Sequence, residues 1–155
     1  MMILNRLYNS GLITTAAKLI VNNINCDYVY INCSDENGID TIRDKVKSFA
    51  SAASFKPQKV VIMDEADFLT INAQAALRNV IETFSLTTRF IFTCNYVECI
   101  IDPIQSRTIV FELTPPSMQD VAFKCVEILD LEGVTYTKAD IVRIVKQTYP
   151  DIKKV

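Results

Sequence analysis

The chain has 155 residues, half of them apolar, and a formal net charge of −2. Three glycines and this apolar content exclude a fibrous or disordered chain, and the length suits one sizeable core with a small appended piece. Apolar runs stay below the about 18 residues that a membrane span needs. Five scattered cysteines without any histidine favour reduced thiols in a cytoplasmic protein over a zinc site. Because the whole chain is not basic, contact with DNA would need a local patch or an assembly.

Helix-like and strand-like segments alternate along the first two thirds of the chain. In chain order the patterns predict a helix at 14–24, a strand at 28–33, a helix at 39–50, a strand at 59–63, a helix at 72–84, and strands at 89–95 and 108–113. This alternation predicts an α/β fold with a parallel sheet between two layers of helices. The first strand of such a sheet is expected to be missing unless Met2-Ile3-Leu4 supplies a short one.

Pro115-Pro116 predicts a boundary, because neither residue continues a helix or a sheet ladder. Two further helices are expected after it, at about 117–131 and 138–149, joined through Gly133. We therefore divide the chain into a core at residues 1–114 and part of a small helical domain at residues 115–155.

The strand expected at 59–63 ends in a group of acids. Its β-branched residues predict a strand buried on both faces, and Asp64, Glu65 and Asp67 follow directly. The carboxyl ends of parallel strands are where open α/β sheets bind ligands. From these residues alone two interpretations stay open: a metal and nucleotide site, or a loop whose acids cap the next helix.

Five motifs in the same order resemble those of AAA+ sliding-clamp loader subunits, of the replication factor C small-subunit type and the phage T4-like large-subunit type. The likeness covers about residues 14–155. The motifs are an Asn-Cys-Ser-Asp segment at 32–43, a Walker B motif at Asp64-Glu65-Ala66-Asp67, the helix segment 73–82, a sensor 1 strand at Phe92-Thr93-Cys94-Asn95, and Ser106-Arg107-Thr108 in place of Ser-Arg-Cys.

The resemblance implies a three-layer P-loop-type AAA+ core followed by a helical lid domain. It implies an ATPase that uses ATP and Mg²⁺ to place a sliding clamp on primer–template DNA. The implied partners are other clamp-loader subunits, the clamp and the DNA, with no membrane. The implied location is the cytoplasm, that of a bacterial host if the protein is phage-encoded.

The resemblance also assigns roles to four residues. Asp64 would order Mg²⁺, mostly through water, and Glu65 would act as the catalytic base. Asn95 would be the sensor 1 residue, although an isolated Asn at a strand end is equally common. Arg107 would be an arginine finger that acts in trans on ATP held by a neighbouring subunit, whereas a lone Arg after Ser would ordinarily be a solvated side chain.

Three further residues are candidates for switching or relay. Asn32 could pair with Glu65 and hold it inactive until DNA binds. Gln74 and Arg78, on the helix after the acids, could relay DNA contact to the site. Arg78 fits a solvated helix face equally well.

The segment before residue 14 departs from the family. Thr14 matches the nucleotide-binding end of a P-loop, but Ile13 stands where the loop needs its phosphate-binding lysine, and Lys18 comes too late to replace it. Lys153 stands at the sensor 2 arginine position, where a lysine keeps the charge but loses the bidentate fork. We therefore expect weak or no ATP binding by this chain alone.

Three functional interpretations follow. The favoured one is a partial clamp-loader subunit, an internal piece of a longer protein without the P-loop and the collar domain. The second is a non-catalytic assembly subunit that donates Arg107 to a neighbour. The third is another AAA+ ATPase of DNA metabolism, such as a helicase loader or a Holliday-junction motor, which the Ser-Arg-Thr and Asn-Cys-Ser-Asp segments disfavour.

Overall fold

The computed structural model describes residues 1–6 and 12–151. These residues form two compact units, a sheet unit at 1–6 and 12–113 and a helical unit at 114–151. Each unit has its own hydrophobic cluster and is described by itself. Among the described residues, no helix is both long and apolar enough to cross a membrane.

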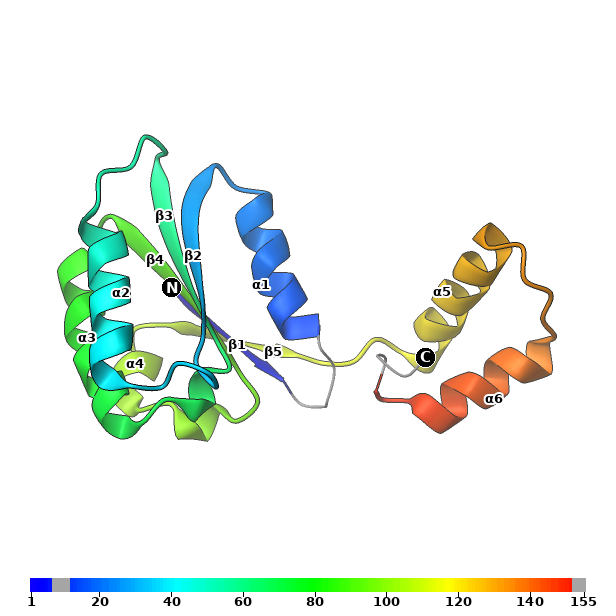
Figure 1. The fold of residues 1–155 in the computed structure, drawn as a ribbon. Coiled ribbons are helices and arrows are strands. Elements are labelled where there is room, and N and C mark those ends of the chain that lie inside the picture. Colours follow the sequence, from blue (N-terminus) through cyan, green and yellow to red (C-terminus); the bar gives the residue numbers. More distant parts are fainter. Residues whose placement is uncertain (7–11, 152–155) are drawn as a thin grey trace. The chain divides into compact units, whose positions relative to one another are not determined.

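The sheet unit is built on five parallel strands in the order β2-β3-β4-β1-β5 (Figure 1). The expected parallel α/β architecture is therefore confirmed. The central strands are the most apolar, and β3 is buried from its second residue onward. The strands are β1 (Met2–Arg6), β2 (Cys26–Asn32), β3 (Gln58–Asp64), β4 (Thr88–Cys94) and β5 (Ile109–Leu113).

Strand β1 corrects the expectation of an incomplete sheet. It lies between β4 and β5, where Leu4 is paired with Thr93 on one side and Phe111 on the other. Ile3 is fully buried and Leu4 is nearly so, which explains why so short an apolar run forms a central strand. The alternative that Met2-Ile3-Leu4 supplies the strand was the right one, and the strand extends two residues further.

The helices of the sheet unit cover its two faces unequally. Helix α1 (Leu12–Asn22) packs on one face, and α2 (Ile39–Ser51) and α3 (Ile71–Phe84) pack on the other (Figure 1). Apolar residues at helical spacing explain both contacts. Val21 of α1 and Ile62 of β3 belong to one cluster, and Leu77 of α3 joins Phe90 and Phe92 in the other.

Three short elements follow the carboxyl ends of β3 and β4. They are the 3₁₀ turns η1 (Ala66–Phe68) and η2 (Val97–Cys99) and helix α4 (Asp102–Gln105). Pro103 lies in the first turn of α4, where its missing N–H costs no hydrogen bond. η1 leads from β3 into α3, whereas η2 and α4 carry the chain from the end of β4 to Arg107.

The helical unit consists of α5 (Met118–Leu131) and α6 (Lys138–Thr148). Thr137 and Asp140 form a reciprocal capping box that begins α6. Gly133 has φ of 66°, a left-handed conformation that suits glycine and lets the chain turn after α5. The core of the helical unit contains three buried residues, Val121, Ile141 and Val145.

Candidate functional site

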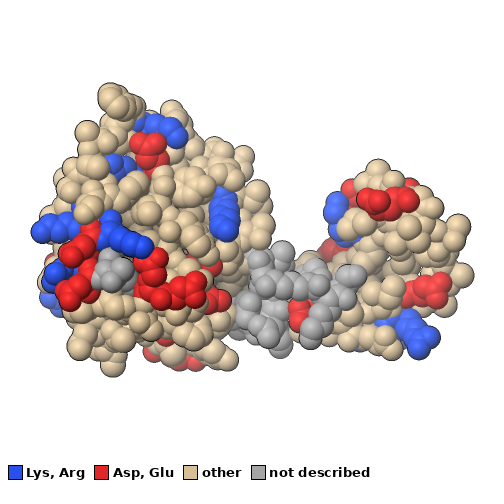
Figure 2. All heavy atoms as spheres, in the orientation of Figure 1, with Lys and Arg blue, Asp and Glu red and all other residues tan. Residues whose placement is uncertain are grey.

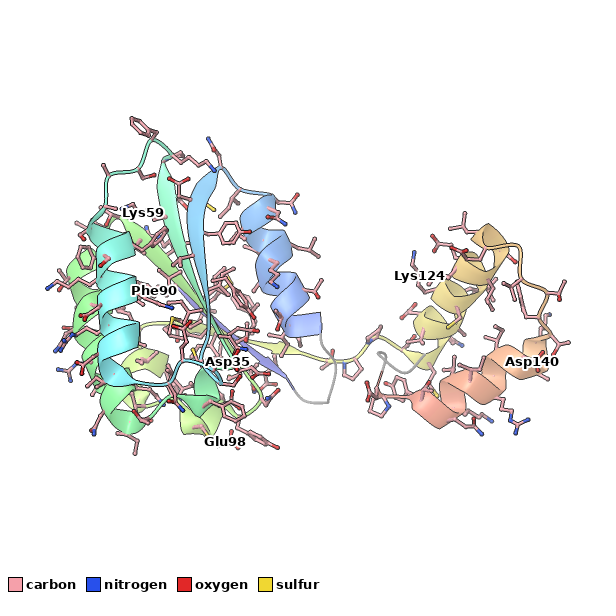
Figure 3. All side chains as sticks on the ribbon, in the orientation of Figure 1. Asp35, Lys59, Phe90, Glu98, Lys124 and Asp140 are labelled. Atoms are coloured by element: carbon pink, nitrogen blue, oxygen red, sulfur yellow. The ribbon has the colours of Figure 1, made fainter. Side chains whose placement is uncertain are left out.

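The carboxyl ends of β2, β3 and β4 meet at one edge of the sheet unit. Asn32 is paired with Asp64 across β2 and β3, and Asn95 follows the end of β4. Figure 3 marks this edge by Asp35, just after β2, and Glu98, in η2, whereas Lys59 lies at the opposite end of β3. Parallel strand direction thus brings together residues that are far apart in the sequence.

Asp64 is the centre of a hydrogen-bonded cluster of hydroxyl groups. The Thr93 hydroxyl donates to one carboxylate oxygen at 2.5 Å, and the Tyr30 hydroxyl donates to the other at 2.6 Å. The Thr14 hydroxyl lies 2.8 and 3.0 Å from the two oxygens. With Asp64 only 5 % exposed, these three hydroxyls supply the hydrogen bonds that a buried carboxylate requires.

Tyr30 is tied into this cluster from two sides. Desolvation, followed by the hydrogen bond to Asp64 and the charge of that carboxylate, raises the pKa of the Tyr30 hydroxyl above its ordinary value. The phenol therefore stays protonated and remains a donor. The ammonium group of Lys18 lies 4.5 Å from the centre of the Tyr30 ring, within cation–π distance.

Glu65 leaves the line of β3 through a left-handed backbone conformation. Its φ is 54°, which is uncommon for a residue other than glycine and indicates local backbone strain. The Glu65 backbone N–H donates to the Thr93 hydroxyl at 3.0 Å, so β4 fixes this turn. Glu65 is half-buried and follows Asp64 directly, and its side chain makes none of the hydrogen bonds of the hydroxyl cluster.

Asn32 makes its hydrogen bonds within its own turn. Its side-chain oxygen accepts from the Ser34 backbone N–H at 3.0 Å and from the Ser34 hydroxyl at 2.8 Å, and its amide donates to Asp35 at 3.0 Å. Such local bonds are typical of Asn in turns. Pairing with Glu65 stays a prediction that would require this turn to rearrange.

Asn95 lies beside the last acid of the Asp64–Asp67 motif. Its backbone N–H donates to one Asp67 oxygen at 3.3 Å. The other Asp67 oxygen is buried and has no hydrogen-bond partner among the described residues. The structure therefore brings Asn95 and Asp67 together at the carboxyl edge.

Half of the expected site fits Mg²⁺ and a nucleotide. Asp64 and Thr14 provide a carboxylate and a hydroxyl, hard oxygen donors of the kind that Mg²⁺ prefers. Ile13, at the lysine position, is 5 % exposed and packs into the cluster beneath α1, where it offers no charge to a phosphate. Residues 7–11, which precede α1, and Lys153 lie outside the described residues.

Arg107 is held after α4 by two hydrogen bonds. Its Nη1 donates to the Pro103 carbonyl at 2.6 Å, and its Nη2 lies 2.7 Å from a carboxylate oxygen of Glu82 on α3. The Arg107 side chain remains 40 % exposed. Arg78, one turn earlier on α3, approaches the same Glu82 oxygen only to 4.0 Å and is also half-exposed.

Gln74 is a buried link within the sheet unit. Its amide donates to the carbonyls of Leu69 and Cys99 at 3.1 and 2.9 Å, and its oxygen accepts from the Ile101 N–H at 2.8 Å. At 1 % exposure Gln74 cannot touch DNA in this conformation. It joins α3 to the segment that leads into α4 and Arg107.

Three residues of these clusters were not among the predicted site residues, namely Tyr30, Thr93 and Glu82. Thr93 lies inside the sensor 1 segment, so its position in the sequence was a usable signal. Tyr30 gave no signal, because its partner Asp64 lies 34 residues away. Glu82 ends the helix segment 73–82, but nothing in the sequence indicated its pairing with Arg107, 25 residues further on.

Charged side chains on the visible face of the sheet unit are mixed. Figure 2 shows acidic groups gathered there with Lys and Arg beside them. Around α2 they form ion pairs, including Arg43 with Asp40 and Lys45 with Glu36. This face does not present the uninterrupted basic surface that binding to the phosphate backbone of DNA needs.

A parallel sheet in the order β2-β3-β4-β1-β5, with acids at the end of β3 and helices on both faces, is the architecture of the P-loop-type α/β fold class. Residues 14–115 match the family described as "ATPase family associated with various cellular activities (AAA)". The chain belongs to this AAA family.

Comparison with curated proteins confirms the expected resemblance to replication factor C. The "Replication factor C small subunit" of Sulfolobus acidocaldarius is 43 % identical over 148 residues, which cover 91 % of this chain and 46 % of the relative. That of Archaeoglobus fulgidus is 40 % identical over 144 residues, covering 92 % and 45 %. The chain thus spans about half the length of these relatives.

Solved structures agree on the fold. The Holliday junction branch migration motor RuvB of Thermotoga maritima superposes with a TM-score of 0.80 at 16 % identity, over 99 % of this chain and 51 % of the other. At this identity the likeness concerns the fold alone.

Proposed function

We propose that this chain acts in an ATP-dependent clamp loader of DNA replication, as a subunit that supplies Arg107 to a neighbour's ATP and binds ATP poorly at its own site. Similarity to replication factor C small subunits supports the class of assembly. The observation that carries the subunit's role is the contrast between a half-exposed Arg107 and a buried Ile13 at the lysine position.

Weak ATP binding by this chain is expected from the charges at its own site. A P-loop lysine offsets phosphate charge, and a buried isoleucine cannot replace it. Lys18 is engaged over Tyr30, and Asp64 already accepts from three hydroxyls. Mg²⁺ at Asp64 would have to displace these bonds without the help of a well-held triphosphate.

The proposed action of Arg107 on a neighbour's ATP is supported by the geometry of its guanidinium. A guanidinium has five N–H donors in a planar fork, so it can hold one partner and still bind a phosphoryl group. The expected partners are the other clamp-loader subunits, the sliding clamp and primer–template DNA. Arg78 is the exposed candidate for DNA contact, and Gln74 would transmit it towards Arg107.

Calorimetric titration of the purified chain with ATP and Mg²⁺ tests whether the chain binds ATP weakly. We expect no saturation below about 1 mM, equivalent to binding weaker than about 4 kcal/mol. Asp64→Asn is the matched variant and is expected to bind no worse than the wild type. Micromolar affinity that Asp64→Asn abolishes would overturn the proposal.

A second candidate is a subunit that hydrolyses its own ATP within the assembly. The retained pair of Asp64 and Glu65 at the carboxyl edge favours it. ATP turnover by the assembly purified through a tag on this chain separates the two candidates. Loss of turnover with Arg107→Ala but not with Glu65→Gln supports the first, and loss with Glu65→Gln supports the second.

A further inference from the structure

Glu82 on α3 forms a close ion pair with Arg107, the candidate arginine finger. Its carboxylate lies 2.7 Å from Nη2 of Arg107, a hydrogen-bonded distance. The same oxygen is 4.0 Å from Nε of Arg78, beyond hydrogen-bond reach. Although two arginines flank Glu82, it therefore binds Arg107 in preference to Arg78.

The bonds to Arg107 leave part of its guanidinium unused. Nη2 is held by Glu82, and Nη1 donates to the Pro103 carbonyl at 2.6 Å, with the Ser106 hydroxyl a distant 3.4 Å away. Three of the five N–H donors at most are engaged. The remaining donors are available for a phosphoryl oxygen while Glu82 and Pro103 keep the group in place.

Both anchors of the guanidinium rest on rigid elements. Glu82 follows Ile81, which is 1 % exposed in the core, and α3 is tied by Gln74 to the segment before α4. Pro103 lies in the first turn of α4, whose Ile104 is also 1 % exposed. The direction of the Arg107 side chain is thus set by two packed helices.

We propose that Glu82 is a positioning residue for Arg107, which holds the guanidinium in the direction needed to reach a neighbouring subunit's phosphates. The inference rests on the proposed function of Arg107 in trans. Glu82 itself touches no substrate. It restricts the Arg107 guanidinium to few orientations, so that less entropy is lost when the guanidinium binds a phosphate.

Steady-state ATP turnover of the assembly purified through a tag on this chain provides the first test. Glu82→Ala should lower kcat by roughly tenfold with KM unchanged, because misplacing a catalytic group by about 1 Å is costly. Glu82→Gln keeps an acceptor oxygen and should recover at least half of the loss. Glu127→Gln on α5, which breaks another exposed ion pair, is the control and should have no effect.

The outcomes separate this inference from the proposed function. No effect of Arg107→Ala overturns the proposed function. A strong effect of Arg107→Ala with wild-type or faster turnover for Glu82→Ala overturns the positioning role alone. Faster turnover would mean that Glu82 withholds the arginine rather than aims it.

The chain by itself gives a second readout, independent of assembly. In nuclear magnetic resonance spectra with ¹⁵N-labelled arginine, the Arg107 guanidinium should show restricted rotation in the wild type. Glu82→Ala should release it, and Glu82→Gln should leave it partly restricted. Free rotation of Arg107 in the wild type would overturn the proposal.

Discussion

Asp64 shows how strongly a single residue depends on groups that lie far from it in the sequence. Thr14, Tyr30 and Thr93 come from α1, β2 and β4, and all three direct a hydroxyl at one buried carboxylate. Each bond to a charged acceptor is worth more than a neutral one, and the carboxylate would be costly to bury without them.

Thr93→Val should destabilise the chain, because the Thr93 hydroxyl both donates to Asp64 and accepts from the Glu65 N–H. Valine keeps the shape and removes both bonds. We expect the free energy of unfolding to fall by about 1–3 kcal/mol, measured by urea denaturation. Thr83→Val, at an exposed position of α3, is the control and should change it by less than about 0.5 kcal/mol. Equal effects of the two variants would mean that the two hydrogen bonds of the Thr93 hydroxyl do not stabilise the chain.

The thiols of Cys33 and Cys94 should be inert in the folded chain. Burial, reinforced by nearby carboxylates such as Asp67, raises the pKa of each thiol to about 12. Any stability that these thiols contribute is complete below pH 9, their ordinary value, and is lost as the pH rises towards 12. At pH 8 a thiol reagent should modify exposed Cys99 first and reach Cys33 and Cys94 only on unfolding. Rapid labelling of Cys33 or Cys94 in Cys99→Ser would refute this.

The sequence was informative about Asp64, indicated Thr14 and Thr93 through their motif positions, and was silent about Tyr30. A β-branched run that ends in acids carries its own signal, since burial and strand direction follow from local pattern. The contacts of Tyr30 and Glu82 depend on which strands and helices become neighbours, a property of the whole sheet. Local pattern does not encode such long-range contacts. The proposed roles of Asn95 and Arg107 stay predictions.

At the scale of elements, strongly periodic segments were the easiest to predict. Helix α2 was expected at 39–50 and runs to Ser51, and α3 was expected from residue 72 and begins at Ile71. Strand β1 was the weak point, because Met2–Arg6 contains only a short apolar run before Asn5 and Arg6. Its position between β4 and β5, rather than its composition, makes it a strand.

Gln74 joins three elements, so Gln74→Leu should weaken their attachment. Leucine has a similar size but leaves the Leu69 and Cys99 carbonyls and the Ile101 N–H without their partner. We expect the free energy of unfolding to fall by roughly 2–5 kcal/mol, with a lower melting temperature by calorimetry. Gln147→Leu, at an exposed position of α6, is the control. A melting temperature unchanged by Gln74→Leu would show that the link is dispensable.

At the scale of the molecule, the two units differ in how much core they bury. The sheet unit contains two clusters, including the fully buried Phe90 and Phe92, whereas the helical unit buries three aliphatic residues. Small cores give small stabilities, because less apolar surface leaves water. The helical unit should therefore open more readily than the sheet.

Native-state hydrogen exchange measures this difference directly. Amides of β3 and β4 should exchange only through global unfolding, and those of α5 and α6 through a local opening of lower free energy. Val145→Ala removes methyl groups from the small core and should lower that opening energy by about 1–3 kcal/mol.

The same substitution should leave the β4 amides unchanged if the units open separately. Val142→Ala, at a half-exposed position of α6, is the matched control and should alter neither set. Equal acceleration of α6 and β4 in Val145→Ala would mean that the chain unfolds as one cooperative unit. Acceleration confined to α5 and α6 would mean that the helical unit can rearrange while the hydroxyl cluster and the Glu82–Arg107 pair stay intact in the sheet unit.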